Sequence, residues 1–157
     1  MPTLHPELTS RGYLPAGTDV AATVREGDEH ALHAVWATFH EIQFIRERLL
    51  PVLDADPAKA EAASHTRAEL AGLADVSALQ ALAANQRLVE LLTGRRWMTM
   101  QAAREAGASW AAVGEALNMT KQGAMDWYKR KIELQEQHVP EFHNAERARA
   151  ALSGDSE

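Results

Sequence analysis

The sequence predicts an all-α protein: a helical bundle that ends in two short helices joined by a tight turn. Apolar residues recur every three or four positions along much of the chain, which is the spacing of one buried helix face. Serine, threonine or aspartate stands directly before several of these stretches, where such residues cap helix N-termini. The alternation of apolar and polar residues that marks a strand does not occur, so no hairpin is expected beside the paired helices.

The N-terminal part is expected to begin with an irregular arm, residues 1–27. This stretch holds three prolines and three glycines, and its apolar residues show little periodicity. Residues 28–99 are expected to form a helical bundle, whose first helix is capped by Asp28 and bends or ends near Pro51. The apolar face of this helix consists of residues at three- and four-residue intervals: Leu32, Val35, Trp36, Phe39, Ile42, Ile45, Leu49 and Leu53.

Two further helices are expected in the bundle. Asp56 caps an alanine-rich helix that has Pro57 at its first position, where a missing N–H costs nothing. Ser77 and Gln80 have the spacing of a capping box, which begins a long helix. Gly94 could break this helix before it reaches the paired helices.

Residues 100–138 contain the two short helices. Ser109 can cap the first of them, because it directly precedes an apolar pattern. The buried face of this helix is expected to hold Trp110, Val113 and Leu117, at i, i+3 and i+7. Gly114 lies near its middle, where the lack of a side chain lets the second helix press against the backbone.

The turn and the second helix follow directly. Asn118 stands at the turn, where a left-handed backbone is needed and asparagine tolerates it second only to glycine. Thr120 then caps the second helix. Its inward face is expected to hold Ala124, Trp127 and Tyr128, at i, i+3 and i+4.

The outer face of the second helix is predicted to be polar. Lys121 lies at its positive N-terminal end, beside an exposed stripe at i, i+3, i+4 and i+7: Gln122, Met125, Asp126 and Lys129. Glutamine pairs with the adenine edge in DNA, and lysine suits phosphate or guanine. Asp126 is the exception, because a carboxylate near phosphates is repelled unless it accepts from a cytosine amine or pairs with a lysine.

This segment resembles the helix-turn-helix DNA-binding domains of small bacterial transcriptional regulators, of a type frequent in GC-rich bacteria. The resemblance covers roughly residues 100–130. It rests on the run Ala103-Arg104-Glu105-Ala106-Gly107-Ala108-Ser109-Trp110 and on Thr120-Lys121-Gln122-Gly123-Ala124. Two positions depart from the usual pattern: Asn118 replaces the turn glycine, and Gly123 stands where alanine is more usual. The resemblance implies a helix starting at Thr120 that reads the major groove. A wing is not expected, because it needs a hairpin and the sequence shows no strand-like alternation.

Charge is unevenly distributed along the chain, whose formal net charge is −6. Residues 1–75 hold six Lys and Arg against twelve Asp and Glu, residues 76–132 hold eight against four, and residues 133–157 hold two against six. Residues 139–157 are therefore expected to be a charged C-terminal tail. The positive part contains the paired helices, as an electrostatic footprint on DNA requires. The small excess of positive charge in residues 76–132 allows only a few phosphate contacts per subunit. Useful affinity would therefore need two subunits or further contacts.

Composition argues against several classes of function. The chain has no cysteine, which rules out disulfides, thiolate catalysis and thiolate zinc sites. No stretch approaches the roughly eighteen apolar residues that cross a bilayer, and the first residues do not resemble a signal peptide, so a cytoplasmic protein without membrane contact is expected. No glycine-rich phosphate loop, Ser-His-Asp order or paired-carboxylate signature is visible. Neither enzymatic activity nor a cofactor is therefore expected.

One histidine pattern is a candidate metal site. His33, His40 and Glu47 recur every seven residues, so they share one side of the first long helix. Ligands seven residues apart lie about 10 Å apart along a helix and cannot share one ion directly. We therefore expect a solvated helix face and no metal site.

These features predict a sequence-specific protein for double-stranded DNA, a homodimeric transcriptional regulator whose target is an inverted repeat. No catalytic residue is expected. The expected DNA contacts lie in the first turns of the second short helix: Gln122 and Lys121 at base edges, Thr120, Lys129 and Arg130 at phosphates, and Met125 and Asp126 in the exposed stripe between them.

The dimer contact is expected on the helix with Trp36, Phe39 and Ile42, which carries more apolar surface than a thin three-helix unit covers. The same stripe could instead pack within the chain, against the helix that begins at Ser77. Two other functions remain open. One is an adaptor whose paired helices bind another protein, and the other is a DNA-handling factor of a mobile element or a plasmid-maintenance system.

Overall fold

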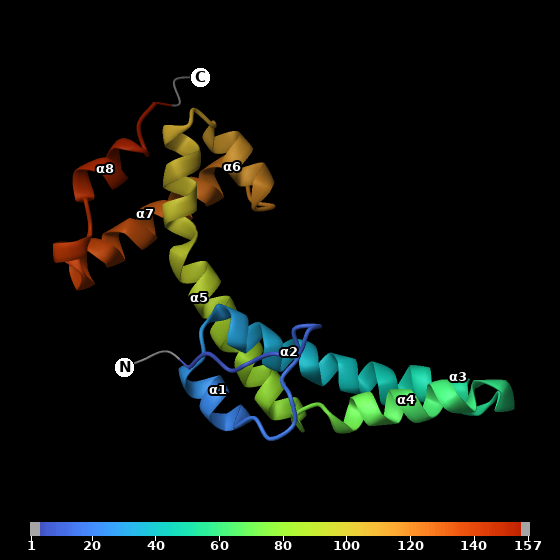
Figure 1. The fold of residues 1–157 in the computed structure, drawn as a ribbon. Helices are drawn as coiled ribbons and strands as arrows, with labels where there is room; N and C mark the ends of the chain where they lie inside the picture. Colours follow the sequence, from blue (N-terminus) through green and yellow to red (C-terminus); the bar gives the residue numbers. More distant parts are fainter. Residues whose placement is uncertain (1–3, 155–157) are drawn as a thin grey trace. The chain divides into compact units, whose positions relative to one another are not determined.

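The computed structural model describes residues 4–154 and is all-α, which confirms the predicted fold class (Figure 1). Three short 3-10 or π segments interrupt the α-helices: η1 (Ile45–Leu49), η2 (Pro57–Lys59) and η3 (Pro140–Phe142). The α-helices are, in chain order, α1 (Val20–Glu26), α2 (Glu29–Phe44), α3 (Leu50–Asp54), α4 (Ala60–Ala71), α5 (Ala78–Glu105), α6 (Trp110–Ala116), α7 (Lys121–His138) and α8 (Ala145–Ala150). The β structure of residues 4–154 consists of two single-residue bridges.

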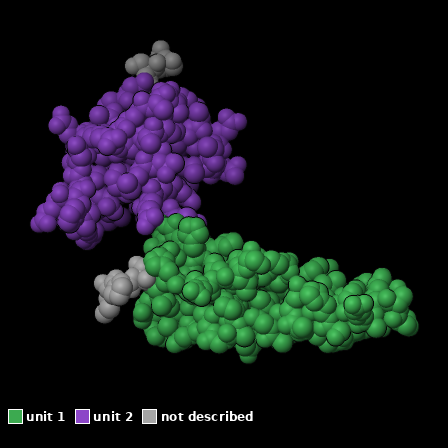
Figure 2. All heavy atoms as spheres, viewed as in Figure 1, with its two compact units in different colours: residues 1–91 green, residues 92–157 purple. Residues whose placement is uncertain are grey.

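The chain forms two compact units, each with its own hydrophobic core (Figure 2). Unit 1 ends at Leu91 and unit 2 begins at Leu92, so both contain part of α5. The sequence predicts the change between residues 99 and 100, but Trp97 already packs against the core of unit 2. Residues 1–3 of the predicted arm and residues 155–157 of the predicted tail lie outside the described residues.

Residues 4–27 belong to the fold of unit 1, although the sequence predicts an irregular arm. Helix α1 lies within this stretch, and the Asp19 carboxylate caps it by accepting a hydrogen bond from the Ala22 N–H (2.9 Å). Leu14 is fully buried, and its N–H donates to the Thr38 hydroxyl on α2 (2.9 Å). The prediction was wrong because such contacts join residues far apart in sequence, which local periodicity does not reveal.

Helix α2 begins where the sequence predicts, since the Asp28 carboxylate accepts a hydrogen bond from the Ala31 N–H (2.8 Å). The core of unit 1 joins α1, α2 and the start of α5. Trp36 and Phe39 lie partly buried against this core, and Ile42 is 3 % exposed. The chain itself therefore covers this apolar stripe. These contacts show the predicted alternative, packing against the helix after Ser77. A dimer contact through the half-buried Trp36 and Phe39 stays a prediction.

A π turn accommodates the proline that follows α2. Pro51 has no N–H, and in a regular α-helix its ring would clash with the carbonyl four residues earlier. The helix widens over η1, where the Leu50 N–H donates to the Ile45 carbonyl five residues back, and it continues as α3. The irregularity expected near Pro51 is thus a local widening of the helix.

Helices α3 and α4 lie side by side as a hairpin (Figure 1). Asp56 caps the connection as predicted, because its carboxylate accepts from the Ala58 N–H (3.0 Å), with Pro57 at the first position. Arg67 on α4 donates two hydrogen bonds of 2.7 Å to Asp54 at the end of α3. The hairpin is therefore closed by a bidentate ion pair at an exposed site.

Helix α5 begins with the predicted capping box. The Ser77 hydroxyl accepts from the Gln80 backbone N–H (3.2 Å), and the Gln80 side-chain Oε1 accepts from the Ser77 N–H (2.9 Å). The helix continues without a break past Gly94. A glycine lowers the stability of a helix by about 1 kcal/mol relative to alanine. This loss is too small to interrupt a helix of 28 residues.

Unit 2 is built around Trp110 and Tyr128, which are fully buried with their ring centres 5.3 Å apart. Met100 from α5, Ile132 from α7 and Ala148 from α8 complete this core. The Tyr128 hydroxyl donates to the Ala148 carbonyl (2.8 Å), which fastens α8 to α7. Burial raises the pKa of Tyr128 to about 12, so the hydroxyl keeps its donor proton at neutral pH.

The C-terminal segment packs on unit 2, whereas the sequence predicts only a charged tail. Arg147 donates two hydrogen bonds to Glu105 on α5 (2.6 and 2.7 Å), and Arg149 donates two to Glu136 on α7 (2.8 and 2.6 Å). Ala148, between the two arginines, is fully buried. The partners stand 42 and 13 residues apart in the sequence, so counting charges could not pair them.

Acid is expected to weaken the attachment of α8. The hydrogen bonds from Arg147, helped by one from Gln101, lower the pKa of Glu105 from 4.5 to about 2. A carboxyl group with a lowered pKa stabilises the fold above pH 4.5, and this stabilisation is lost as the pH falls toward 2. Melting temperatures measured over this window should fall less steeply for Glu105→Gln than for the parent. The matched control Glu115→Gln, at an exposed position on α6, should keep the parent's slope.

Candidate nucleic-acid interface

Helix α6 is the first of the paired helices, and it is capped as the sequence predicts. The Ser109 hydroxyl accepts a hydrogen bond from the Ala112 N–H (3.1 Å). Trp110 and Val113 are buried, and Leu117 is partly buried against the core of unit 2. The predicted inward face of this helix is therefore confirmed.

The turn after α6 depends on the left-handed conformation of Asn118. Its φ is 52°, and within residues 4–154 no other residue except glycine has a positive φ. The Met119 N–H then donates to the Gly114 carbonyl (2.8 Å) and closes the turn. Asparagine thus takes the place that glycine holds in many such turns, as the sequence predicts.

Gly114 is the point at which α6 touches the chain beyond the turn. A Cβ atom there would lie 2.7 Å from the Met119 carbonyl oxygen and 3.0 Å from the Thr120 carbonyl oxygen. Both neighbours are backbone atoms, which cannot move aside as the end of a flexible side chain could. The predicted need for a glycine is confirmed, with one refinement: the close contact is made by the residues just before α7.

Helix α7 is capped by Thr120, whose hydroxyl accepts from the Gly123 N–H (3.0 Å). Its buried residues recur every four positions: Ala124, Tyr128 and Ile132. This spacing fixes the rotation of the helix about its axis, because one side of α7 must face the core. The opposite side is left to solvent.

Trp127 lies at the edge of the buried side, whereas the sequence predicts that it faces inward. It is only partly buried, and its ring centre lies 5.5 Å from the Arg96 guanidinium carbon and 5.5 Å from the Lys131 ammonium nitrogen. The phase of the helix explains the difference, since successive residues are turned by about 100° and the buried stripe includes Tyr128. Two cations thus stack on a half-exposed indole.

The predicted DNA contacts are mostly exposed. Thr120 is exposed while its hydroxyl caps α7, and Met125 is partly buried against the core of unit 2. The prediction that Met125 is exposed was wrong because it stands two turns before the buried Ile132 on the same side of the helix. The other predicted residues have exposed side chains: Lys121, Gln122, Asp126, Lys129 and Arg130.

Two of the exposed residues are joined to each other. The Gln122 Nε2 donates a hydrogen bond to the Asp126 Oδ1 (2.8 Å), across one turn of α7. The sequence suggests a lysine or a cytosine amine as the groups that could offset the Asp126 charge, and it does not predict this bond to Gln122. The four-residue spacing was the available signal, because such positions are neighbours on a helix surface.

Lys129 and Arg130 supply unpaired positive charge. Neither has an ion-pair partner within residues 4–154, so both can meet an anion from solution. Arg147 and Arg149 differ, since each is held by a glutamate in a bidentate pair. The free cations of unit 2 therefore include two neighbouring residues in the third turn of α7.

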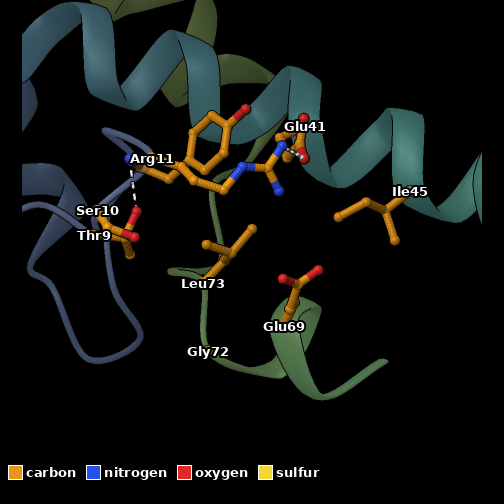
Figure 3. A pocket seen from close by; sticks show the side chains of 9 residues that line it. Thr9, Ser10, Arg11, Glu41, Ile45, Glu69, Gly72 and Leu73 are labelled. Carbon is orange, nitrogen blue, oxygen red and sulfur yellow. Dashed lines mark hydrogen bonds and ion pairs between the residues drawn. The ribbon is translucent and has the colours of Figure 1, made fainter. Parts of the chain in front are cut away.

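Unit 1 contains a separate pocket of about 210 Å³, lined by residues of the N-terminal segment, α2 and α4 (Figure 3). Arg11 forms an ion pair with Glu41 (3.1 Å) and stacks on the ring of Tyr13 (5.3 Å). Burial, with a hydrogen bond to Glu41, raises the pKa of Tyr13. These polar groups satisfy one another, and the pocket is smaller than the roughly 300 Å³ at which ligand sites begin. We assign it no ligand.

Within residues 4–154, no group of three or more histidine or carboxylate side chains is placed to hold a metal ion. His33 and His40 are exposed on α2, and the His40 ring lies against Trp36, with ring centres 4.2 Å apart. Among the helices of the described part, none is long and apolar enough to cross a membrane.

Comparison of the chain with protein-family models, curated proteins and solved structures gives no match. The geometry of α6 and α7 is therefore the basis for a function. This geometry has three elements: a close contact at Gly114 without room for a side chain, a capped helix, and an exposed polar face at that helix's N-terminal end.

Proposed function

We propose that this protein binds double-stranded DNA in a sequence-specific manner and acts as a transcriptional regulator, with α6 and α7 as a helix-turn-helix. The observation that carries the proposal is the exposed face of α7, which holds amide and cationic side chains directly after a rigid turn. The major groove of B-DNA admits one α-helix, whose N-terminal residues contact base edges. A capped N-terminus also offers backbone N–H groups and a positive dipole to phosphates.

Each exposed residue has a role in this proposal. Gln122 and Lys121 lie in the first turn of α7 and contact base edges. Lys129 and Arg130 contact phosphates, which supports binding to any sequence. The Thr120 hydroxyl accepts from the Gly123 N–H and donates its own proton to a phosphate oxygen.

The proposal includes a homodimer in the cytoplasm that binds an inverted repeat. Two free cations on α7 give each subunit few phosphate contacts, and a second subunit doubles them. Two recognition helices about 34 Å apart would enter successive major grooves on one face of the duplex. The dimer contact does not involve Ile42, which is buried in unit 1.

Lys129→Ala tests the phosphate role. A duplex is first selected from a random pool with the parent protein, and binding is then titrated by gel shift at several salt concentrations. The variant should bind the selected duplex and an unrelated duplex with equally reduced affinity, because phosphates carry no sequence information. Its slope of log affinity against log salt should be smaller by about one unit.

Lys59→Ala is the matched control, since it removes an exposed lysine from η2 in unit 1. Its affinities and salt slope should equal those of the parent. A parent protein that retards no duplex at low salt would contradict the proposal and leave an adaptor function. A Lys129→Ala variant with the parent's salt slope would show that phosphates are bound elsewhere.

A further inference from the structure

We propose that Asp126 is a positioning residue for base readout: its carboxylate holds the Gln122 amide in the orientation that recognises adenine. This inference rests on the proposed function. It adds a residue whose charge by itself opposes DNA binding. The structural basis is the hydrogen bond of 2.8 Å from Gln122 Nε2 to Asp126 Oδ1.

The bond fixes which end of the amide faces which way. A carboxylate offers only acceptor atoms, so the NH2 group of Gln122, and not its carbonyl oxygen, must point toward Asp126. Without a partner, the exposed glutamine side chain would rotate freely and present either end to a base. Holding it in one orientation before binding lowers the conformational entropy lost in the complex.

The held amide still offers the pair of atoms that adenine needs. In the major groove adenine presents its N6 amino donor and its N7 acceptor side by side. Glutamine matches them with Oε1 and with the Nε2 hydrogen on the same side as Oε1. The second Nε2 hydrogen points the other way, and it can donate to Asp126 while adenine is bound. One amide thus serves both partners.

A purely electrostatic role for Asp126 predicts a different behaviour. A carboxylate close to DNA repels phosphates, so its removal should raise affinity for every duplex by a similar factor. A positioning role predicts that its removal lowers discrimination at one base pair only. The preference for the selected duplex over an unrelated one therefore stays unchanged in the electrostatic account and falls in the positioning account.

The experiment compares the full-length parent with Gln122→Ala, Asp126→Ala and Asp126→Asn. The probes are the duplex selected by the parent, the same duplex with each base pair replaced in turn, and an unrelated duplex. The parent should prefer A·T at one position in each half-site, and Gln122→Ala should lose that preference. Asp126→Ala should reduce the same preference about threefold to tenfold while its affinity for the unrelated duplex stays equal or rises.

Asp126→Asn is the conservative variant, because its Oδ1 can still accept the hydrogen bond from Gln122 without carrying charge. It should restore the preference that Asp126→Ala loses. Both substituted positions are exposed, so circular dichroism should show unchanged melting for all three variants.

Three outcomes would overturn the inference. If Asp126→Ala raises affinity for all duplexes equally and keeps the A·T preference, the carboxylate acts only as a charge and the proposed function stands. If it alters preference at a different base pair, Asp126 reads a base itself. If the parent binds no duplex at all, the proposed function fails and the inference fails with it.

Discussion

Trp110→Ala is expected to unfold unit 2 far more readily, with a loss of about 3 to 5 kcal/mol in the free energy of unfolding. The Trp110 indole is fully buried, and its ring centre lies 5.3 Å from that of Tyr128 and 5.2 Å from the Arg104 guanidinium carbon. Removing it from a small core leaves a cavity between α5, α6 and α7 that the fixed turn cannot close. Urea unfolding measures the loss, and hydrogen exchange by peptide assigns it to unit 2.

Trp127→Ala is the matched control, since it truncates the same residue type in the same unit. Trp127 is only partly buried and stacks with Arg96 and Lys131, so its removal should cost about 1 to 2 kcal/mol. Equal losses in the two variants would contradict the difference in burial between the two indoles.

The helices with local signals could be predicted from the sequence. Asp28, Asp56, Ser77 and Thr120 each cap a helical segment as predicted, because a capping side chain and the N–H it accepts from lie within three residues of each other. The left-handed Asn118 was predicted for the same reason, since the conformation depends on the residue type at that one position.

The two ends of the chain could not be predicted in this way. The N-terminal segment is held by the hydrogen bond from Leu14 to Thr38, and the C-terminal segment by the ion pair between Arg147 and Glu105. Each contact joins residues 24 or 42 positions apart, and no periodic pattern records such a pairing. Composition described these segments as proline-rich and charged, which is correct but does not determine whether they pack.

The exposure of most candidate contact residues could be predicted from the sequence, whereas burial at the borders of the exposed face could not. The exposure of Gln122 and Lys129 followed from spacing alone, because it needs only the period of the helix. Met125 and Trp127 lie at the borders of the buried stripe, where a rotation of a few tens of degrees changes burial. The spacing of four residues places Gln122 next to Asp126 on the helix surface. Only the coordinates show that Gln122 bonds to Asp126 and not to another neighbouring side chain.

Gly114→Leu is expected to abolish binding to the selected duplex, because the added side chain clashes at the contact that sets the angle between α6 and α7. Even the first added atom, Cβ, would lie 2.7 Å from the Met119 carbonyl oxygen, closer than carbon and oxygen approach without a bond. The turn must therefore open, and α7 then leaves the position in which its first residues reach base edges. Gly114→Ala should show a weaker form of the same loss.

Gly94→Ala is the control for this substitution, since it also lies within a helix of unit 2. A Cβ atom there meets nothing within 4 Å, so the variant should keep the parent's binding and gain up to about 1 kcal/mol from its better helix propensity. Binding is compared at a temperature where circular dichroism shows every variant folded, which separates a displaced α7 from an unfolded one. A folded Gly114→Leu variant that still prefers the selected duplex would mean that the angle between α6 and α7 does not matter for recognition. The DNA-reading surface would then have to lie outside this pair of helices.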